Sequence, residues 1–300
     1  MSARRASQGV PPAFVGDVLT WFDEAARDLP WREPSTTPWG VLVSEVMLQQ
    51  TPVSRVVPAY EAWIRRWPDP AAMAADAPGE AVRMWGRLGY PRRALRLHAA
   101  ATACVERHSG EVPASFDDLL ALAGVGDYTA AAVAAFAYGQ RCAVLDTNVR
   151  RVHARVFDAS ERPVTTSVTV GERARATDLL PATAASAARL SVAVMELGAL
   201  VCTARSPACS ACPVRSSCAW LLAGRPAWAG APRKGQTYEG TDRQCRGRLL
   251  GVLRSESAPV ARTALDALWP DAVQRERALD SLVSDGLVEP LANNFFALPR

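Results

Sequence analysis

The chain has 300 residues, enough for two packed domains or for one domain with an appendage. Its hydrophobic fraction of 49% and charged fraction of 21% are those of an ordinary soluble globular protein, and no apolar stretch is long enough to span a membrane. The arginines near the N-terminus are not followed by an apolar segment, so we expect no signal peptide and a cytoplasmic location. The net charge of +4 permits a polyanionic partner such as a nucleic acid.

Alanine and leucine dominate the sequence and β-branched runs are short, which predicts a mainly α-helical fold. The first predicted helix covers residues 10–29 and ends at Pro30, and Thr37-Pro38 provides the N-cap and the first position of the next helix. Further helices are predicted at 53–67, 79–87, 92–108, 115–122, 127–138, 147–157, 171–180 and 186–200.

Residues 224–240 are rich in glycine and proline and lack periodicity, which is typical of a linker. Beyond it the pattern predicts short helices at 242–254, 261–268 and 272–285, and then a hairpin that turns at Asn293-Asn294. Three helices and a hairpin are typical of a winged-helix-like domain. The eight arginines and eight acids of residues 241–300 cancel, so this tail contributes nothing to the positive charge.

Four of the seven cysteines fall in one short segment with the spacing Cys202-x6-Cys209-x2-Cys212-x5-Cys218. A tight cysteine cluster in a cytosolic chain indicates metal binding rather than disulfides. Four thiolates can enclose one zinc ion or an iron–sulfur cluster, and general spacing rules leave both open. The segment leaves no ligand position free for a substrate, so its expected role is structural.

A glycine-rich turn, Gly124-Val-Gly126-Asp-Tyr128, joins two predicted helices. The glycines let the backbone turn and leave the amides at the start of the next helix free to bind phosphate. A plain turn between helices would have the same pattern, so this signal is weak by itself.

Two carboxylates lie in motifs that suggest chemistry. Glu45 stands in an apolar run, where partial desolvation favours the protonated form of a general acid. Asp146 follows a short apolar segment and begins a predicted helix, where aspartate is also a common N-cap.

Together these motifs resemble the MutY adenine DNA glycosylases of the helix-hairpin-helix, or endonuclease III, superfamily. Ser44-Glu-Val-Met-Leu-Gln-Gln-Thr51 matches the family's S-E-V-M-L-Q-Q-T letter for letter, and residues 144–149 resemble its L-D-G-N-V segment, with Thr147 in place of glycine. The resemblance covers roughly residues 14–222 and favours a 4Fe-4S cluster over zinc. It implies a six-helix domain at 31–140 and a cluster domain of 1–30 with 141–223, followed by the linker at 224–240 and the tail at 241–300.

The resemblance also implies a mechanism in base excision repair. Glu45 would protonate adenine mispaired with 8-oxoguanine or guanine, and Asp146 would stabilise the sugar oxocarbenium ion, as in two-carboxylate glycosidases. Endonuclease III cuts the strand with a lysine in the hairpin. At the corresponding position this chain has Tyr128, which is the third expected catalytic residue. Since Lys234 in the linker is the only lysine, a lysine-dependent strand cut is nearly excluded.

A glycosylase must also extrude its target base from the duplex. By resemblance, Gln50 and Tyr90 are wedge residues that fill the gap, and Trp31-Arg32 lies near the adenine pocket, although Trp31 could simply pack in a core. We expect a monomer that works on the DNA of the nucleoid.

Four alternatives remain open: a thymine mismatch glycosylase, endonuclease III itself, a non-catalytic DNA-binding module with a redox cluster, and a zinc-ribbon interaction protein. The tail is too short for the NUDIX-like domain with which many MutY proteins recognise 8-oxoguanine, and its own role is not indicated by the sequence.

Overall fold

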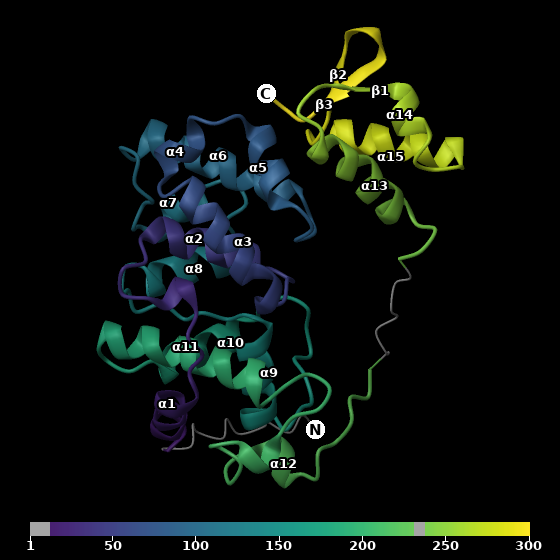
Figure 1. The fold of residues 1–300 in the computed structure, drawn as a ribbon. Helices are drawn as coiled ribbons and strands as arrows, with labels where there is room; N and C mark the ends of the chain where they lie inside the picture. Colours follow the sequence, from purple (N-terminus) through teal and green to yellow (C-terminus); the bar gives the residue numbers. More distant parts are fainter. Residues whose placement is uncertain (1–12, 231–237) are drawn as a thin grey trace. The chain divides into compact units, whose positions relative to one another are not determined.

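The computed structural model describes residues 13–230 and 238–300, and these form a mainly helical protein with one small sheet (Figure 1). The helical fold expected from the composition is confirmed. None of the described helices is long and apolar enough to cross a membrane. The chain divides into two compact units, Met1–Asp28 with Asp127–Pro232 and Leu29–Gly126 with Arg233–Arg300.

The first of these, the cluster unit, is built on α9 and α11, which pack against each other and against α1 and α12. Its elements are α1 (Phe14–Ala25), α8 (Asp127–Phe136), α9 (Thr147–Phe157), α10 (Val170–Leu179), α11 (Ala184–Leu200), η2 (Cys209–Ala211) and α12 (Ala219–Leu222). Its apolar core includes Phe14, Val152 and Leu197, which are fully buried. Residues 127–140, which we expected in the six-helix domain, fall in this unit because α8 contacts α11.

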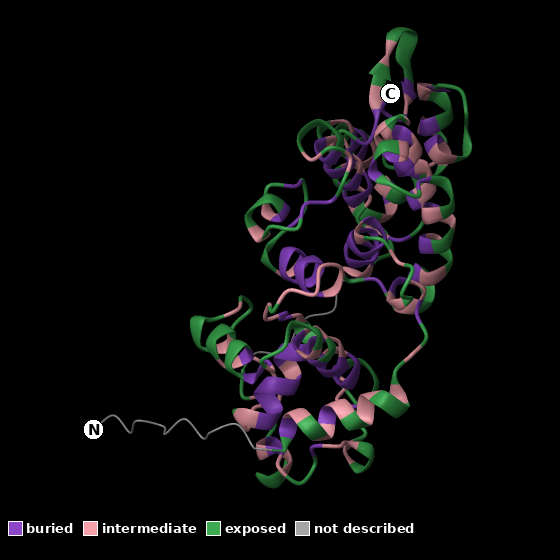
Figure 2. Ribbon diagram, turned by 90° about the vertical axis from the view of Figure 1, so that its left-hand side faces the viewer, coloured by how far each residue is buried: buried purple, intermediate pink, exposed green. Residues whose placement is uncertain are grey.

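The second, the hairpin unit, contains the helices that precede the glycine-rich turn together with the C-terminal tail. Its elements are η1 (Pro30–Arg32), α2 (Pro38–Leu48), α3 (Val53–Arg66), α4 (Pro70–Ala74), α5 (Pro78–Trp85), α6 (Arg92–Arg107), α7 (Phe116–Leu120), α13 (Asp242–Ser255), β1 (Val260–Ala261), α14 (Arg262–Asp266), α15 (Ala272–Ser284), β2 (Glu289–Leu291), η3 (Ala292–Asn294) and β3 (Phe295–Ala297). Trp63, Trp67 and Trp85 meet edge to face in its core, and Figure 2 shows burial on the inner helix faces.

The tail has the winged-helix-like arrangement that the sequence predicts, with one addition. The hairpin of β2 and β3 turns at Asn293 and Asn294, which both take a positive φ, as asparagine can. A third short strand, β1, pairs with β3 to give the order β1-β3-β2. Two residues are too few for a strand to be predicted from alternation, so the sequence missed it.

Candidate active site and metal centre

Glu45 lies in the middle of α2, which is buried along almost its whole length. Thr37 caps the helix by accepting a hydrogen bond from the Gly40 amide at 3.2 Å, with Pro38 at the first helical position as expected. Glu45 is only 5% exposed, and the apolar residues on either side of it are buried as well. The fold therefore buries this carboxyl group inside the hairpin unit.

Asp146 is the N-cap of α9 in the cluster unit. One carboxylate oxygen accepts from the Val149 amide at 2.6 Å, and the other accepts from the Asn148 side-chain amide at 2.7 Å. Burial raises the pKa of Asp146, while these hydrogen bonds and the charge of Arg151 oppose the rise. These two donors fix the carboxylate in one orientation. A fixed orientation is needed if the carboxylate is to face a positive charge that develops during the reaction.

A chain of hydrogen bonds that the sequence did not reveal connects Asp146 to the cysteine loop. Arg151 donates to the Asn148 side-chain oxygen at 2.8 Å and to the Cys202 carbonyl oxygen at 2.7 Å. Gly198 on α11 permits this packing, because a Cβ there would lie 2.7 Å from the Asn148 Cβ. Asn148 stands two residues after the N-cap aspartate and matches the asparagine of the family's L-D-G-N-V segment, and these two features were the available signals for its role.

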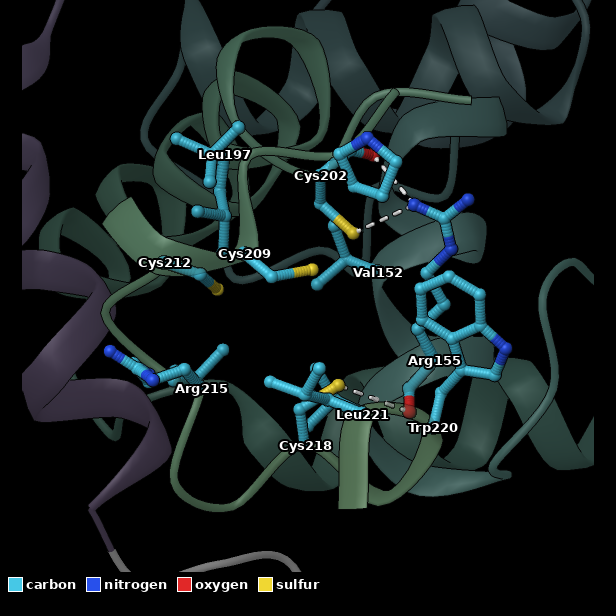
Figure 3. Close-up of a pocket in the computed structure, with 14 residues that line it drawn as sticks. Val152, Arg155, Leu197, Cys202, Cys209, Cys212, Arg215, Cys218, Trp220 and Leu221 are labelled. Atoms are coloured by element: carbon cyan, nitrogen blue, oxygen red, sulfur yellow. Dashed lines mark hydrogen bonds between the residues drawn. The ribbon is translucent and has the colours of Figure 1, made fainter. Parts of the chain in front are cut away.

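The four cysteines of the loop line one pocket in the cluster unit, with their sulfur atoms around its centre (Figure 3). In the described residues no group of three or more His, Cys, Asp or Glu side chains is arranged to hold a single metal ion. Burial raises the pKa of Cys212 to about 11, and the neighbouring thiols add to the rise, so a thiolate at this position needs a cationic group beside it. Four cysteine side chains that line one pocket are the donor set of a four-thiolate metal site.

Arg155 also contacts the cysteine loop. It is 1% exposed, donates to the Cys202 sulfur at 3.3 Å and lies 4.6 Å from the centre of the Trp220 ring. A buried guanidinium beside a sulfur ligand offsets negative charge on the thiolates and helps to hold the loop in place.

The glycine-rich turn joins α7 to α8. Gly124 has φ +81°, and a Cβ there would lie 2.9 Å from the Arg96 side chain, so the fold itself requires glycine. At Gly126 a Cβ would meet nothing within 4 Å, so packing does not explain that residue, whereas close approach of a phosphate would. Tyr128 is half-buried in the first turn of α8.

Gln50 and Tyr90 are both exposed and lie at the tips of two short loops of the hairpin unit, with φ of +56° and +48°. Two hydrogen bonds join these loops: Thr51 donates to the Leu88 carbonyl at 3.2 Å, and Arg93 donates to the Gln49 carbonyl. Left-handed backbone at two non-glycine residues is uncommon and concentrates at functional loops.

Trp31 lies in η1 and is 9% exposed, with its ring edge to face against Tyr60 at 5.3 Å. Burial also raises the pKa of Tyr60 to about 12, so that its hydroxyl stays protonated. Trp31 is therefore part of the core of the hairpin unit, and Arg32 beside it is half-buried.

Two family models match the chain. One describes the HhH-GPD superfamily of base excision DNA repair proteins and matches residues 43–170. The other describes the iron–sulfur binding domain of endonuclease III and matches residues 202–218, which begin and end with outer cysteines of the loop. The expected iron–sulfur site is thereby confirmed.

Among solved structures, a thermostable thymine-DNA glycosylase has a TM-score of 0.63 at 25% identity, covering 70% of this chain and 96% of its own. A thymine/uracil-DNA glycosylase of Pyrobaculum aerophilum is 35% identical over 68% of this chain and 89% of its own.

An adenine DNA glycosylase of Mycobacterium tuberculosis is more similar still, at 51% identity over 291 residues, or 96% of this chain and 95% of its own. A match of that extent includes most of the tail, beyond the core that the thymine glycosylases share. Similarity across both units and the tail, with both motif regions present, shows that the chain belongs to the adenine DNA glycosylases, the enzymes of base excision repair that hydrolyse the N-glycosidic bond of adenine.

Proposed function

We propose that the chain releases adenine mispaired with 8-oxoguanine or guanine, and that it does so as a monofunctional glycosylase. The observation that carries this proposal is the pair of carboxyl groups in unlike environments, Glu45 buried in an apolar helix and Asp146 fixed at a helix N-terminus. Groups whose surroundings differ in this way suit the separate tasks of acid and charge stabiliser.

In the proposed mechanism Glu45 donates a proton to a ring nitrogen of adenine, which turns the base into a better leaving group. The bond between base and sugar then breaks, and Asp146 stabilises the positive charge on the sugar. Water adds to the sugar, and Glu45 takes a proton back, which completes hydrolysis.

The strand itself should stay uncut. The position of the lysine in strand-cutting relatives corresponds to Tyr128, a phenol that does not form a Schiff base. Lys234 is the only lysine of the sequence and lies outside the described residues.

We further propose that the DNA partner is held by backbone contacts and opened by a wedge. The amides after Gly124 and Gly126 would bind phosphates, and Gln50 and Tyr90 would enter the duplex where the adenine has left it. The linked loops that hold Gln50 and Tyr90 support this role, because a wedge must be rigid to keep the stack open. Trp31 and Arg32 would border the adenine pocket, and the protein would act as a monomer at the nucleoid.

The iron–sulfur cluster would be held by Cys202, Cys209, Cys212 and Cys218. When bound, it supplies a fixed positive core that orders the loop, and the proposed reaction uses no electron transfer.

Single-turnover base release from four duplexes tests the proposal: 8-oxoguanine:A, guanine:A, guanine:T and an oxidised pyrimidine opposite guanine. Each reaction is divided, and one half is treated with alkali to cleave abasic sites. Adenine release that is visible only after alkali supports the proposal, and the rate ratio of the first two duplexes measures recognition of 8-oxoguanine. Release of thymine would contradict the substrate, and strand cutting without alkali would contradict the monofunctional reaction.

A further inference from the structure

The C-terminal tail is fixed to α5 of the same unit by backbone hydrogen bonds and by two half-buried arginines. The Gly79 amide donates to the Pro299 carbonyl at 2.8 Å. Arg254 of α13 donates to the Val82 carbonyl at 2.9 Å, and Arg83 of α5 donates to the Glu256 carbonyl at 2.8 Å. The tail is thus held in one position against the hairpin unit.

Arg254 is the centre of this seam. Burial lowers its pKa to about 10, yet a guanidinium with that pKa is still charged at neutral pH. The hydrogen bonds that it donates to the Val82 and Gly86 carbonyls offset part of the cost of burying this charge. The seam therefore holds the last turn of α13, where Arg254 lies, against the end of α5 and the start of the loop that follows it.

That loop ends in Tyr90, and the first turn of α13 brings a second arginine to its ring. The guanidinium of Arg243 lies 5.6 Å from the centre of the Tyr90 ring, and that of Arg93 lies 4.6 Å from it. Arg243 also lies 5.8 Å from the ring of Tyr238. Tyr90 is 50% exposed, and its backbone is in the left-handed region. The two guanidinium groups therefore limit the rotation of the ring through cation–π contacts.

Two other arginines of the tail form ion pairs with acidic side chains, whereas Arg243 forms none with the described residues. Arg246 is ion-paired with Asp285, and Arg277 with Asp242. Among the residues that the structure describes, no acid is recorded as an ion-pair partner of Arg243, and the residue is exposed. Its charge is thus available to the aromatic ring beside it and to phosphate.

We propose that Arg243 is a positioning residue for the wedge: the docked tail delivers its guanidinium to Tyr90 and orients the ring for insertion into the duplex. The inference rests on the proposed function, since it gives the tail a part in opening the duplex. It also explains how an electrically neutral tail can assist base opening, because one exposed arginine beside the wedge ring is sufficient.

The test measures base opening and base release separately, with duplexes that carry 2-aminopurine next to the target adenine. We expect Arg243→Ala to reduce the rise in fluorescence on binding and to slow single-turnover release about three- to fivefold, as expected for loss of an exposed cation–π contact. Arg243→Lys keeps the cation and should recover most of both signals. In a Tyr90→Ala background Arg243→Ala should have no further effect, since the partner ring is absent.

Arg248→Ala is the matched control, because Arg248 is an exposed arginine on the same helix that lies over Trp269 instead, 5.1 Å from the ring centre. It removes the same charge and should leave both signals at the wild-type level. Three results would overturn the inference. Arg243→Ala could leave the fluorescence rise and the release rate unchanged, or Arg248→Ala could reduce them equally. The third is an effect of Arg243→Ala that adds to that of Tyr90→Ala. Wild-type protein is measured on the same duplexes, and failure to release adenine there would count against the proposed function rather than against Arg243.

Discussion

Asp146 performs two tasks with one carboxylate, and they make different demands on it. As an N-cap it needs one oxygen to accept from the Val149 amide, and asparagine fills that role nearly as well as aspartate. As a stabiliser of positive charge it must be ionised, which an amide cannot be. The substitution Asp146→Asn separates the two tasks.

We expect Asp146→Asn to lower the single-turnover rate of base release by about 10²- to 10³-fold or more, the cost of removing one well-oriented electrostatic group. Binding to the mispaired duplex should stay within about twofold, because the cap is kept and α9 is unchanged. The control is Asp69→Asn, which alters the N-cap of α4 at an exposed position and should leave release intact. Loss of binding in proportion to release would show that the cap is the only role of Asp146.

Local motifs were sufficient to select Glu45 and Asp146 as candidates, since each stands out from its immediate neighbours. Arg151 and Arg93 were missed because their roles depend on what the fold brings close to them. Arg151 connects Asn148 to Cys202, which lies 51 positions away along the chain, and Arg93 reaches a carbonyl 44 positions away. Nothing in a run of arginines marks which one will be buried against a distant loop.

At the scale of helices, prediction succeeded where a cap or a proline directly preceded the first helical residue, whereas the first helix ends at Ala25 and not at the predicted position 29 before Pro30. The helix over 147–157 and those beginning at 53 and 92 were placed to within one residue, because the positions before them are a capping aspartate and two prolines. Two helices of four or five residues, α4 and α12, were missed, since they are too short to show a 3.6-residue period.

Helix α9 also carries a group that should make folding stability depend on pH. His153 is fully packed between the rings of Phe14 and Phe157, and burial lowers its pKa to about 4, with the charge of Arg175 adding to the effect. The unfolded chain, with a histidine pKa near 6.5, binds a proton between pH 6.5 and 4 that the folded protein does not. Stability from this group is therefore complete above about pH 6.5 and is lost as the pH falls toward 4.

At pH 5 the loss attributable to His153 should be about 2 kcal/mol relative to pH 7. The variant His153→Phe keeps an aromatic ring in the same site and removes the titrating group. Denaturant unfolding at pH 7 and pH 5 should show a smaller drop for the variant than for the wild type. Equal drops in the two proteins would mean that His153 does not titrate in this range.

At the scale of the molecule, the sequence indicated a separate tail after the linker, and the structure assigns that tail to the hairpin unit. The change in composition over residues 224–240 predicted a linker, and residues 231–237 of it lie outside the described part of the chain. Composition does not reveal which surface a domain packs on, because that depends on backbone carbonyls and glycines such as Gly79, which carry no pattern of their own.

Gly79 provides the test of that docking. A Cβ on this residue would lie 2.3 Å from the Pro299 carbonyl oxygen and 2.9 Å from the Leu298 Cβ, and backbone atoms there have little room to yield. We expect Gly79→Ala to destabilise the docked tail by about 1–3 kcal/mol, the cost of overpacking a close contact. The control is Gly251→Ala in the middle of α13, where a Cβ would meet nothing within 4 Å and alanine should be neutral or slightly stabilising.

Limited proteolysis followed by mass spectrometry reports on the tail directly, with cleavage before α13 as the signal. Gly79→Ala should be cut faster than the wild type at low protease concentration, and Gly251→Ala should not. Because Arg243 is delivered by the docked tail, Gly79→Ala should also slow base release to the extent that Arg243→Ala does. Rapid cleavage with an unchanged rate of release would separate docking from wedge positioning and leave the tail with a purely structural role.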